Sequence, residues 1–106
     1  MRTIVTARHC EIPDDLKERA ETLVEKTARA AHRPQRAEII FDVDHGRKVV
    51  ELQLVLPRGR VKVATAEDDD FRSALDAAVA KLRNQLGKGS ESERSPRRGL
   101  GRSAAS

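Results

Sequence analysis

The chain has 106 residues, of which 38% are apolar and 36% charged, and its net charge is +4 at neutral pH. This length allows one folded domain with a single two-layer core. Phe41 and Phe71 are the only aromatic residues. Proteins that hold single-stranded nucleic acid by base stacking use exposed aromatic rings, so a nucleic-acid partner would be bound here through charge and shape.

The lone Cys10 excludes an internal disulfide and cannot complete a zinc site by itself. We therefore expect a reduced thiol in a cytoplasmic protein. No apolar run approaches the roughly 20 residues that cross a bilayer, and residues 1–5 lack the apolar core of a secretory signal. We accordingly expect no membrane partner.

A strand followed by a helix is predicted for the first third of the chain. Residues 3–8 are short and β-branched, as in a strand. Pro13, followed by two aspartates, signals a helix start. Apolar or small side chains then recur from Leu16 to Ala31 at helical spacing. Pro34 ends this helix because it pushes the preceding residue out of the helical conformation.

Three consecutive strands are predicted in the middle of the chain. Apolar and polar residues alternate over residues 38–44, 50–56 and 60–65. The segments 45–47 and 57–59 contain glycine and are predicted turns. One face of the resulting sheet is apolar and the other largely polar, which is typical of an antiparallel sheet covered on one side.

The chain closes with a second helix and a tail. Apolar residues from Phe71 to Leu86 follow helical spacing after Asp70, and Gly87 ends the helix. We predict one domain over residues 1–88. Residues 89–106 are rich in Gly, Ser, Arg, Glu and Pro, so a disordered basic tail is predicted there.

The element order β-α-β-β-β-α predicts an α+β fold in which a four-stranded sheet carries two helices on one face. The strand–helix–strand crossover makes the first two strands parallel if they are neighbours. The two hairpins that follow then give the fourth strand the direction of the second. Both helices return against such strands, so we expect them to lie roughly parallel, with their carboxyl ends side by side.

Each predicted helix begins with acidic residues and ends with basic ones, which the helix dipole alone favours. The dipole does not require that two basic ends meet, yet the predicted topology brings them together. Arg36 is expected nearby, and the segment from Lys88 onward carries +3 of the net charge. We therefore predict a patch that binds a polyanion. Its cations come from the two helix ends: Lys26, Arg29, Arg33, Lys81, Arg83 and Lys88.

The second helix resembles the closing helix of the ribosome hibernation-promoting factor family, also called the ribosome-associated inhibitor A or sigma-54 modulation protein family. The resemblance is carried there by residues 70–76 and 81–88. Residues 4–9 resemble the family's opening strand, and residues 11–17 resemble the start of its first helix. The resemblance spans residues 2–88 in the same element order.

This resemblance implies a translation inhibitor that binds the small ribosomal subunit at the decoding region and blocks the mRNA and tRNA sites. It implies ribosomal RNA as partner, with no DNA, no cofactor and no enzymatic activity. The implied rRNA-binding residues are Lys26, Arg29, Arg33, Lys81, Arg83, Gln85 and Lys88, with Arg8 and Lys48 as secondary candidates.

The sequence also departs from the family pattern. Leu23 stands where the first helix commonly has another Lys or Arg, and Arg72 replaces a usual Tyr. Many members carry a second domain that pairs two ribosomes. This chain ends in the tail instead, so direct ribosome dimerisation is not implied.

Two other functions are compatible with the pattern: a double-stranded-RNA-binding module, and a protein-interaction adaptor in which only the tail contacts nucleic acid. Catalysis and metal binding are not predicted, because His9, His32 and His45 fall in different elements. The acidic residues 67–70 could bind Mg²⁺ together with rRNA phosphates, but we expect them to cap the second helix.

Overall fold

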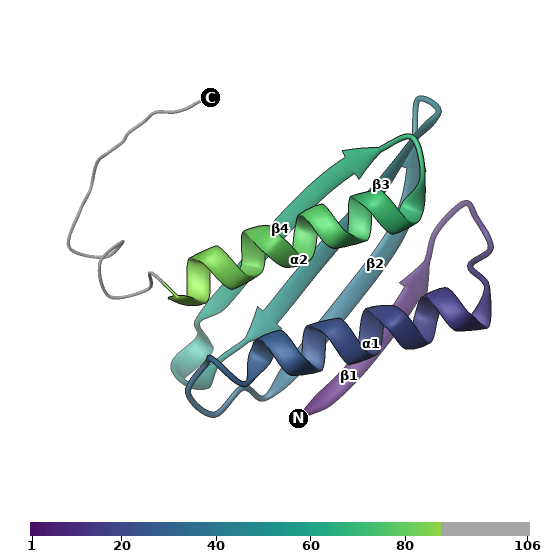
Figure 1. The fold of residues 1–106 in the computed structure, drawn as a ribbon. Coiled ribbons are helices and arrows are strands. Elements are labelled where there is room, and N and C mark those ends of the chain that lie inside the picture. Colours follow the sequence, from purple (N-terminus) through teal and green to yellow (C-terminus); the bar gives the residue numbers. More distant parts are fainter. Residues whose placement is uncertain (88–106) are drawn as a thin grey trace, which may run out of the picture.

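The computed structural model describes residues 1–87, which form one four-stranded sheet with two helices on the same face (Figure 1). The strands are β1 (Arg2–Ala7), β2 (Arg36–Asp44), β3 (Arg47–Val55) and β4 (Val61–Asp68), and the helices are α1 (Asp14–Ala28) and α2 (Phe71–Gly87). The predicted α+β sandwich and its element order are confirmed. The predicted tail and Lys88 lie outside the described residues.

The strands follow one another across the sheet in the order β1-β2-β3-β4. β1 pairs with β2 in parallel, and the two following pairs are antiparallel. The crossover through α1 and the return through α2 therefore leave both helices running in the same direction. Figure 1 shows their carboxyl ends at the same end of the sheet, beside the turn between β3 and β4.

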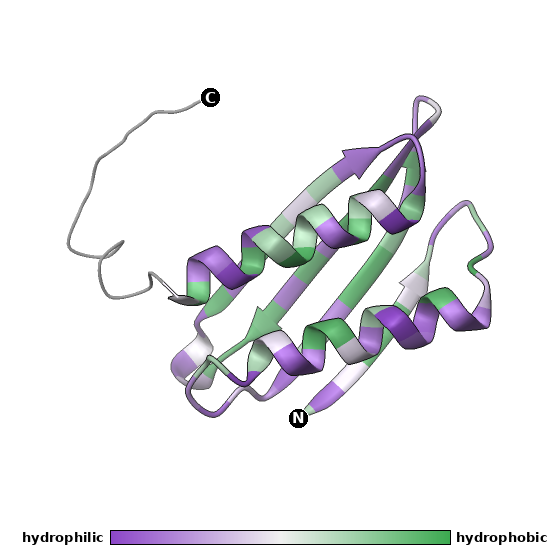
Figure 2. Cartoon of the chain, in the orientation of Figure 1, coloured by the Kyte–Doolittle hydropathy of each residue, from purple (hydrophilic) through white to green (hydrophobic). Residues whose placement is uncertain are grey.

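The core lies between the helices and one face of the sheet. On β2 and β3 every second side chain faces the helices, and Ile39, Phe41, Leu52 and Leu54 are fully buried there. Hydrophobic positions also recur along both helices (Figure 2), whose buried residues include Leu75. The apolar strand face, with its period of two residues, thus packs against the apolar helix faces, with their period of about 3.6 residues, to form one core.

Several element boundaries differ from the prediction. α1 ends at Ala28 rather than near Ala31, because its last turn tightens: the backbone N–H of Ala31 donates to the carbonyl of Ala28 at 2.9 Å. β2, β3 and β4 are longer than predicted, since main-chain pairing continues past the alternating apolar residues, whereas β1 has the predicted length and begins one residue earlier. Arg47, assigned to a turn from the sequence, pairs with Asp44 as the first residue of β3.

The two hairpin turns use left-handed backbone conformations. His45 and Gly46 have φ of 53° and 79°, as a two-residue hairpin loop with positive φ at both positions requires. The second turn is a 3₁₀ turn over Pro57–Gly59. Arg58 is left-handed within it, with φ 68° and ψ 30°.

The start of α2 is fixed by Asp70, whose carboxylate accepts hydrogen bonds from the backbone N–H of Ser73 at 2.8 Å and from its hydroxyl at 3.0 Å. A carboxylate in this position satisfies a backbone donor that the helix leaves free. These bonds lower the pKa of Asp70 below its ordinary value, the backbone bond contributing most. The expectation that the acidic segment caps the second helix holds for Asp70.

Truncation of Leu75 tests the core. Leu75→Ala should lower the free energy of unfolding by about 2–5 kcal/mol, because it leaves a cavity between α2 and the sheet. Val63→Ala, at a position 46% exposed on β4, should lower it by less than about 1 kcal/mol. Urea unfolding followed by circular dichroism measures both. If both variants lost the same free energy of unfolding, Leu75 would not belong to the buried core between α2 and the sheet.

The Asp70 cap should make stability depend on pH in a defined direction. Because the folded-state pKa is lowered, the stabilisation is present above the ordinary aspartate value of 3.8 and is lost as the pH falls through the lowered value. Asp70→Ala should therefore reduce the melting temperature at neutral pH, and its difference from the wild type should shrink in acid. Glu18→Ala, which removes an exposed carboxylate elsewhere, should show no such convergence.

Candidate nucleic-acid interface

Positive charge gathers at the end of the domain where both helices terminate. The three stretches 26–37, 52–66 and 77–87 contain nine Lys or Arg residues and no Asp or Glu. The fold brings the end of α1, the β3–β4 turn and the end of α2 to the same end of the sheet (Figure 1). We call this region the basic end, formed by Arg2, Lys26, Arg29, Arg33, Arg36, Arg58, Arg60 and Arg83.

The placement of Lys26 and Arg83 follows from an ion pair between the helices. Arg19 on α1 contacts both carboxylate oxygens of Asp76 on α2, at 3.0 and 3.2 Å. Lys26 and Arg83 each lie seven residues further along, which is two turns or about 10.5 Å in the same direction on the same side of each helix. Because the helices are parallel, both cations lie toward the basic end, on the sides of the two helices that carry this ion pair.

Lys81 and Gln85 occupy a different side of α2. The Lys81 ammonium donates to the carbonyl of Thr65 at 2.8 Å, and the Gln85 amide donates to the carbonyl of Val63 at 2.8 Å. Both carbonyls belong to β4, the last strand of the sheet. These two predicted rRNA-binding side chains therefore satisfy a strand edge that would otherwise present free acceptors.

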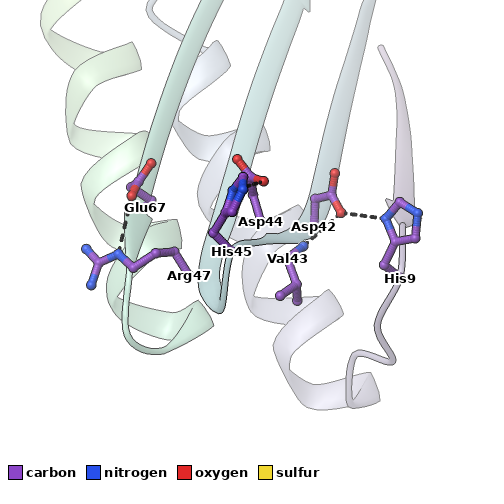
Figure 3. Close-up of polar contacts among 7 residues, drawn as sticks. All are labelled: His9, Asp42, Val43, Asp44, His45, Arg47 and Glu67. Atoms are coloured by element: carbon purple, nitrogen blue, oxygen red, sulfur yellow. Dashed lines mark hydrogen bonds and ion pairs between the residues drawn. The ribbon is translucent and has the colours of Figure 1, made fainter.

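The opposite end of the domain is acidic, and Arg47 and His9 contact carboxylates there (Figure 3). Arg47 contacts Glu67 at 3.3 Å and Asp69 at 2.7 Å. The imidazole of His9 lies 3.0 Å from a carboxylate oxygen of Asp42. That hydrogen bond is the main reason that the pKa of Asp42 is lowered.

Arg8 and Lys48, the secondary candidates from the sequence, lie at this acidic end rather than with the helix carboxyl ends. The backbone N–H of Arg8 donates to the carbonyl of Phe41 at 2.8 Å, which prolongs the pairing of β1. The Lys48 ammonium lies 5.9 Å from the ring centroid of Phe71, at cation–π distance. The structure therefore separates both residues from the basic end.

Cys10 is half-buried, with its sulfur 3.7 Å from the carbonyl oxygen of Phe41. Burial raises the pKa of its thiol, and the nearby Asp42 carboxylate raises it further. A protonated thiol is a poor nucleophile and metal ligand. Over residues 1–87 no group of three or more His, Cys, Asp or Glu side chains is placed to hold a metal ion. None of the helices described there is both long and apolar enough to cross a membrane.

Arg58, Arg60 and Arg2 belong to the basic end but were not among the residues predicted from the sequence. Helix periodicity points only to residues on helices, and these three lie in a turn or on strands. The absence of acids from residues 52–66 could have indicated Arg58 and Arg60.

The family description "Sigma 54 modulation protein / S30EA ribosomal protein" matches residues 3–94. This chain belongs to that family. The resemblance noted from the sequence is thereby confirmed, and the known members to which the chain is similar support it.

A curated ribosome hibernation promoting factor of Pseudomonas putida is 32% identical over 98 residues, which cover 90% of this chain and 92% of the relative. The solved structure of a ribosomal subunit interface protein from Coxiella burnetii is 28% identical, with a TM-score of 0.69 over 86% of this chain and 99% of that one. The N-terminal domain of Protein Y from Thermus thermophilus, 24% identical with a TM-score of 0.69, covers 81% and 94% and shows the shared fold.

The edge contacts of Lys81 and Gln85 can be tested by removing their donors. Lys81→Met with Gln85→Leu should leave helix content unchanged but expose two β4 carbonyls and promote self-association. Light scattering across a concentration series measures this. Arg72→Met with Asn84→Leu removes comparable polarity from α2 residues that make no such contact with β4. Its self-association should match the wild type, and equal association of both double variants would contradict the assigned role.

Proposed function

We propose that this protein is a cytoplasmic ribosome hibernation factor that binds small-subunit rRNA at the decoding region and blocks the mRNA and tRNA sites. Family membership supports the ribosome as partner, and a relative that covers nearly the whole chain is named for hibernation. The observation that carries the proposal is the basic end, where two parallel helices and the turns beside them bring their cations together.

The electrostatics favour an anionic ligand at this end. Within residues 1–87 the arginines that form ion pairs with carboxylates are Arg19 and Arg47, and neither lies at the basic end. The helix carboxyl ends carry partial negative charge, so phosphate is attracted there only if cations outweigh it. Lys26, Arg29 and Arg83 provide that excess, which makes binding depend on those side chains rather than on the backbone.

Phosphates and shape, rather than bases, are the features this protein can recognise. Phe41 is fully buried, and the Phe71 ring packs against it edge to face at 5.5 Å. Both rings thus lie away from the basic end, so base stacking, by which single-stranded RNA is usually held, contributes nothing there. Contacts with phosphates release counterions, so affinity should fall steeply with salt.

The ribosomal proposal is favoured over the two other functions considered from the sequence. Modules for double-stranded RNA typically carry a lysine cluster at the start of the last helix. Here that start is acidic, and Asp70 is engaged as a cap. An adaptor that contacts nucleic acid only through its tail would not account for the cations gathered on the folded domain. The relatives of this chain are ribosome-associated factors rather than enzymes.

Charge reversal at the helix ends tests the proposed function. Lys26→Glu with Arg83→Glu should weaken binding to purified small subunits about 50-fold or more at about 0.1 M salt, because each lost phosphate contact accounts for about eightfold there. Lys81 is left intact because its change would also disturb β4. Co-sedimentation and translation inhibition in a purified system are the measurements.

Lys17→Glu with Arg72→Glu is the matched control, since it reverses one Lys on α1 and one Arg on α2 away from the basic end. This variant should still sediment with small subunits and inhibit translation. Unchanged binding by the Lys26 and Arg83 variant, with its fold intact, would remove the proposed interface.

A further inference from the structure

Four residues other than glycine have a left-handed backbone within residues 1–87: His9, Arg33, His45 and Arg58. This conformation brings the side chain close to the backbone, so glycine is favoured there, and Asn, Asp and His are enriched among the alternatives. The two histidines follow that preference. The arginines, at φ 53° and 68°, do not, and both belong to the basic end.

A backbone hydrogen bond connects the two segments that carry these arginines. Arg33 lies in the connection from α1 to β2, and Arg58 lies in the turn between β3 and β4. The backbone N–H of Gln35 donates to the carbonyl of Val55 at 2.9 Å, which joins the first connection to the strand leading into the second. Both side chains are therefore held on one ordered edge of the domain rather than on independent loops.

A second unfavourable arrangement lies beside them. Arg2 and Arg36 are direct neighbours in the parallel pairing of β1 with β2. Like charges opposite each other across two strands destabilise a sheet. Both side chains are exposed on the face away from the helices, since the alternate residue Ala37 is buried under them. In the part of the chain that the structure describes, neither arginine has a carboxylate partner close enough for an ion pair.

We propose that Arg33 and Arg58, together with Arg2 and Arg36, form a second phosphate-binding surface within the basic end, which extends the surface of Lys26, Arg29 and Arg83 from the helix layer onto the open face of the sheet. Each of these four positions is unfavourable for the isolated domain, either in backbone conformation or in charge repulsion. A polyanion bound at this end offsets both disadvantages, because it neutralises the repulsion and uses the strained arginines as ligands.

This inference rests on the proposed function and specifies the ligand further. Lys26 and Arg83 lie in the helix layer, whereas Arg2 and Arg36 lie on the opposite side of the sheet. Cations on both layers contact two separate phosphate segments at once. A folded RNA offers two backbones close together, and a single extended strand does not. The surface therefore selects folded RNA.

Arg33→Gly and Arg58→Gly separate binding from folding, because glycine suits the left-handed backbone better than arginine does. Each variant should keep or raise the melting temperature while binding small subunits about eightfold more weakly at about 0.1 M salt. Each should also reduce the slope of log affinity against log salt by about 1. The double variant should lose most of its preference for small subunits over oligouridylate.

Two controls match these variants. His45→Gly makes the same backbone change at the acidic end, and Arg72→Ala removes a cation there; both should bind within about twofold of the wild type, since neither loses a phosphate contact. Arg58→Asn keeps a residue that tolerates the left-handed conformation. It should reproduce the binding loss of Arg58→Gly even if the glycine variant proves unstable.

The outcomes distinguish this surface from the proposed function. If the Lys26 and Arg83 reversal abolishes binding while the Arg33 and Arg58 variants keep wild-type affinity and salt slope, the second surface is refuted and the proposed function stands. If the wild type ignores small subunits but binds isolated folded rRNA through Arg33 and Arg58, the surface stands and the ribosomal function falls. Binding to neither refutes both.

Discussion

The parallel pairing of β1 with β2 is the constraint on which the rest of the molecule depends. It requires α1 to cross over the sheet, and the two hairpins that follow set the direction of α2 to match. Two helices that run the same way place their dipoles and their charged termini together. An antiparallel helix pair with the same residues would alternate acidic and basic ends, and no concentrated cationic surface would form.

Gathering cations at one end raises the free energy of the folded chain, because like charges repel over a Debye length of about 8–10 Å. The buried core and the ion pairs elsewhere hold the domain together against this repulsion. Arg19 with Asp76 ties the helices to each other, and Arg47 with Glu67 and Asp69 joins the strands at the acidic end. These ion pairs thus stabilise the domain at positions away from the basic end.

The fold could be predicted from the sequence because its signals are local: alternation on the strands, a stripe on each helix, and proline or glycine at the breaks. The crossover rule then fixed the helix directions. What could not be predicted was the direction of individual side chains. Lys81 and Arg83 are two residues apart and both basic, yet the first donates to β4, while the second lies two turns beyond Asp76, on the side of α2 that carries the ion pair to α1. The role of Arg58 in the basic end was not predicted, because helix and strand periodicity give no information about a left-handed residue in a turn.

The family departures are consistent with a redistribution of charge on the basic end. Leu23, where the first helix commonly has a cation, packs against the core here. Arg58 and Arg60 place cations at the same end of the domain through the β3–β4 turn instead. Electrostatic affinity for a phosphate backbone depends on the number of contacts rather than on which element supplies each one. In the proposed interface, a lost helix cation can therefore be offset by arginines in the β3–β4 turn.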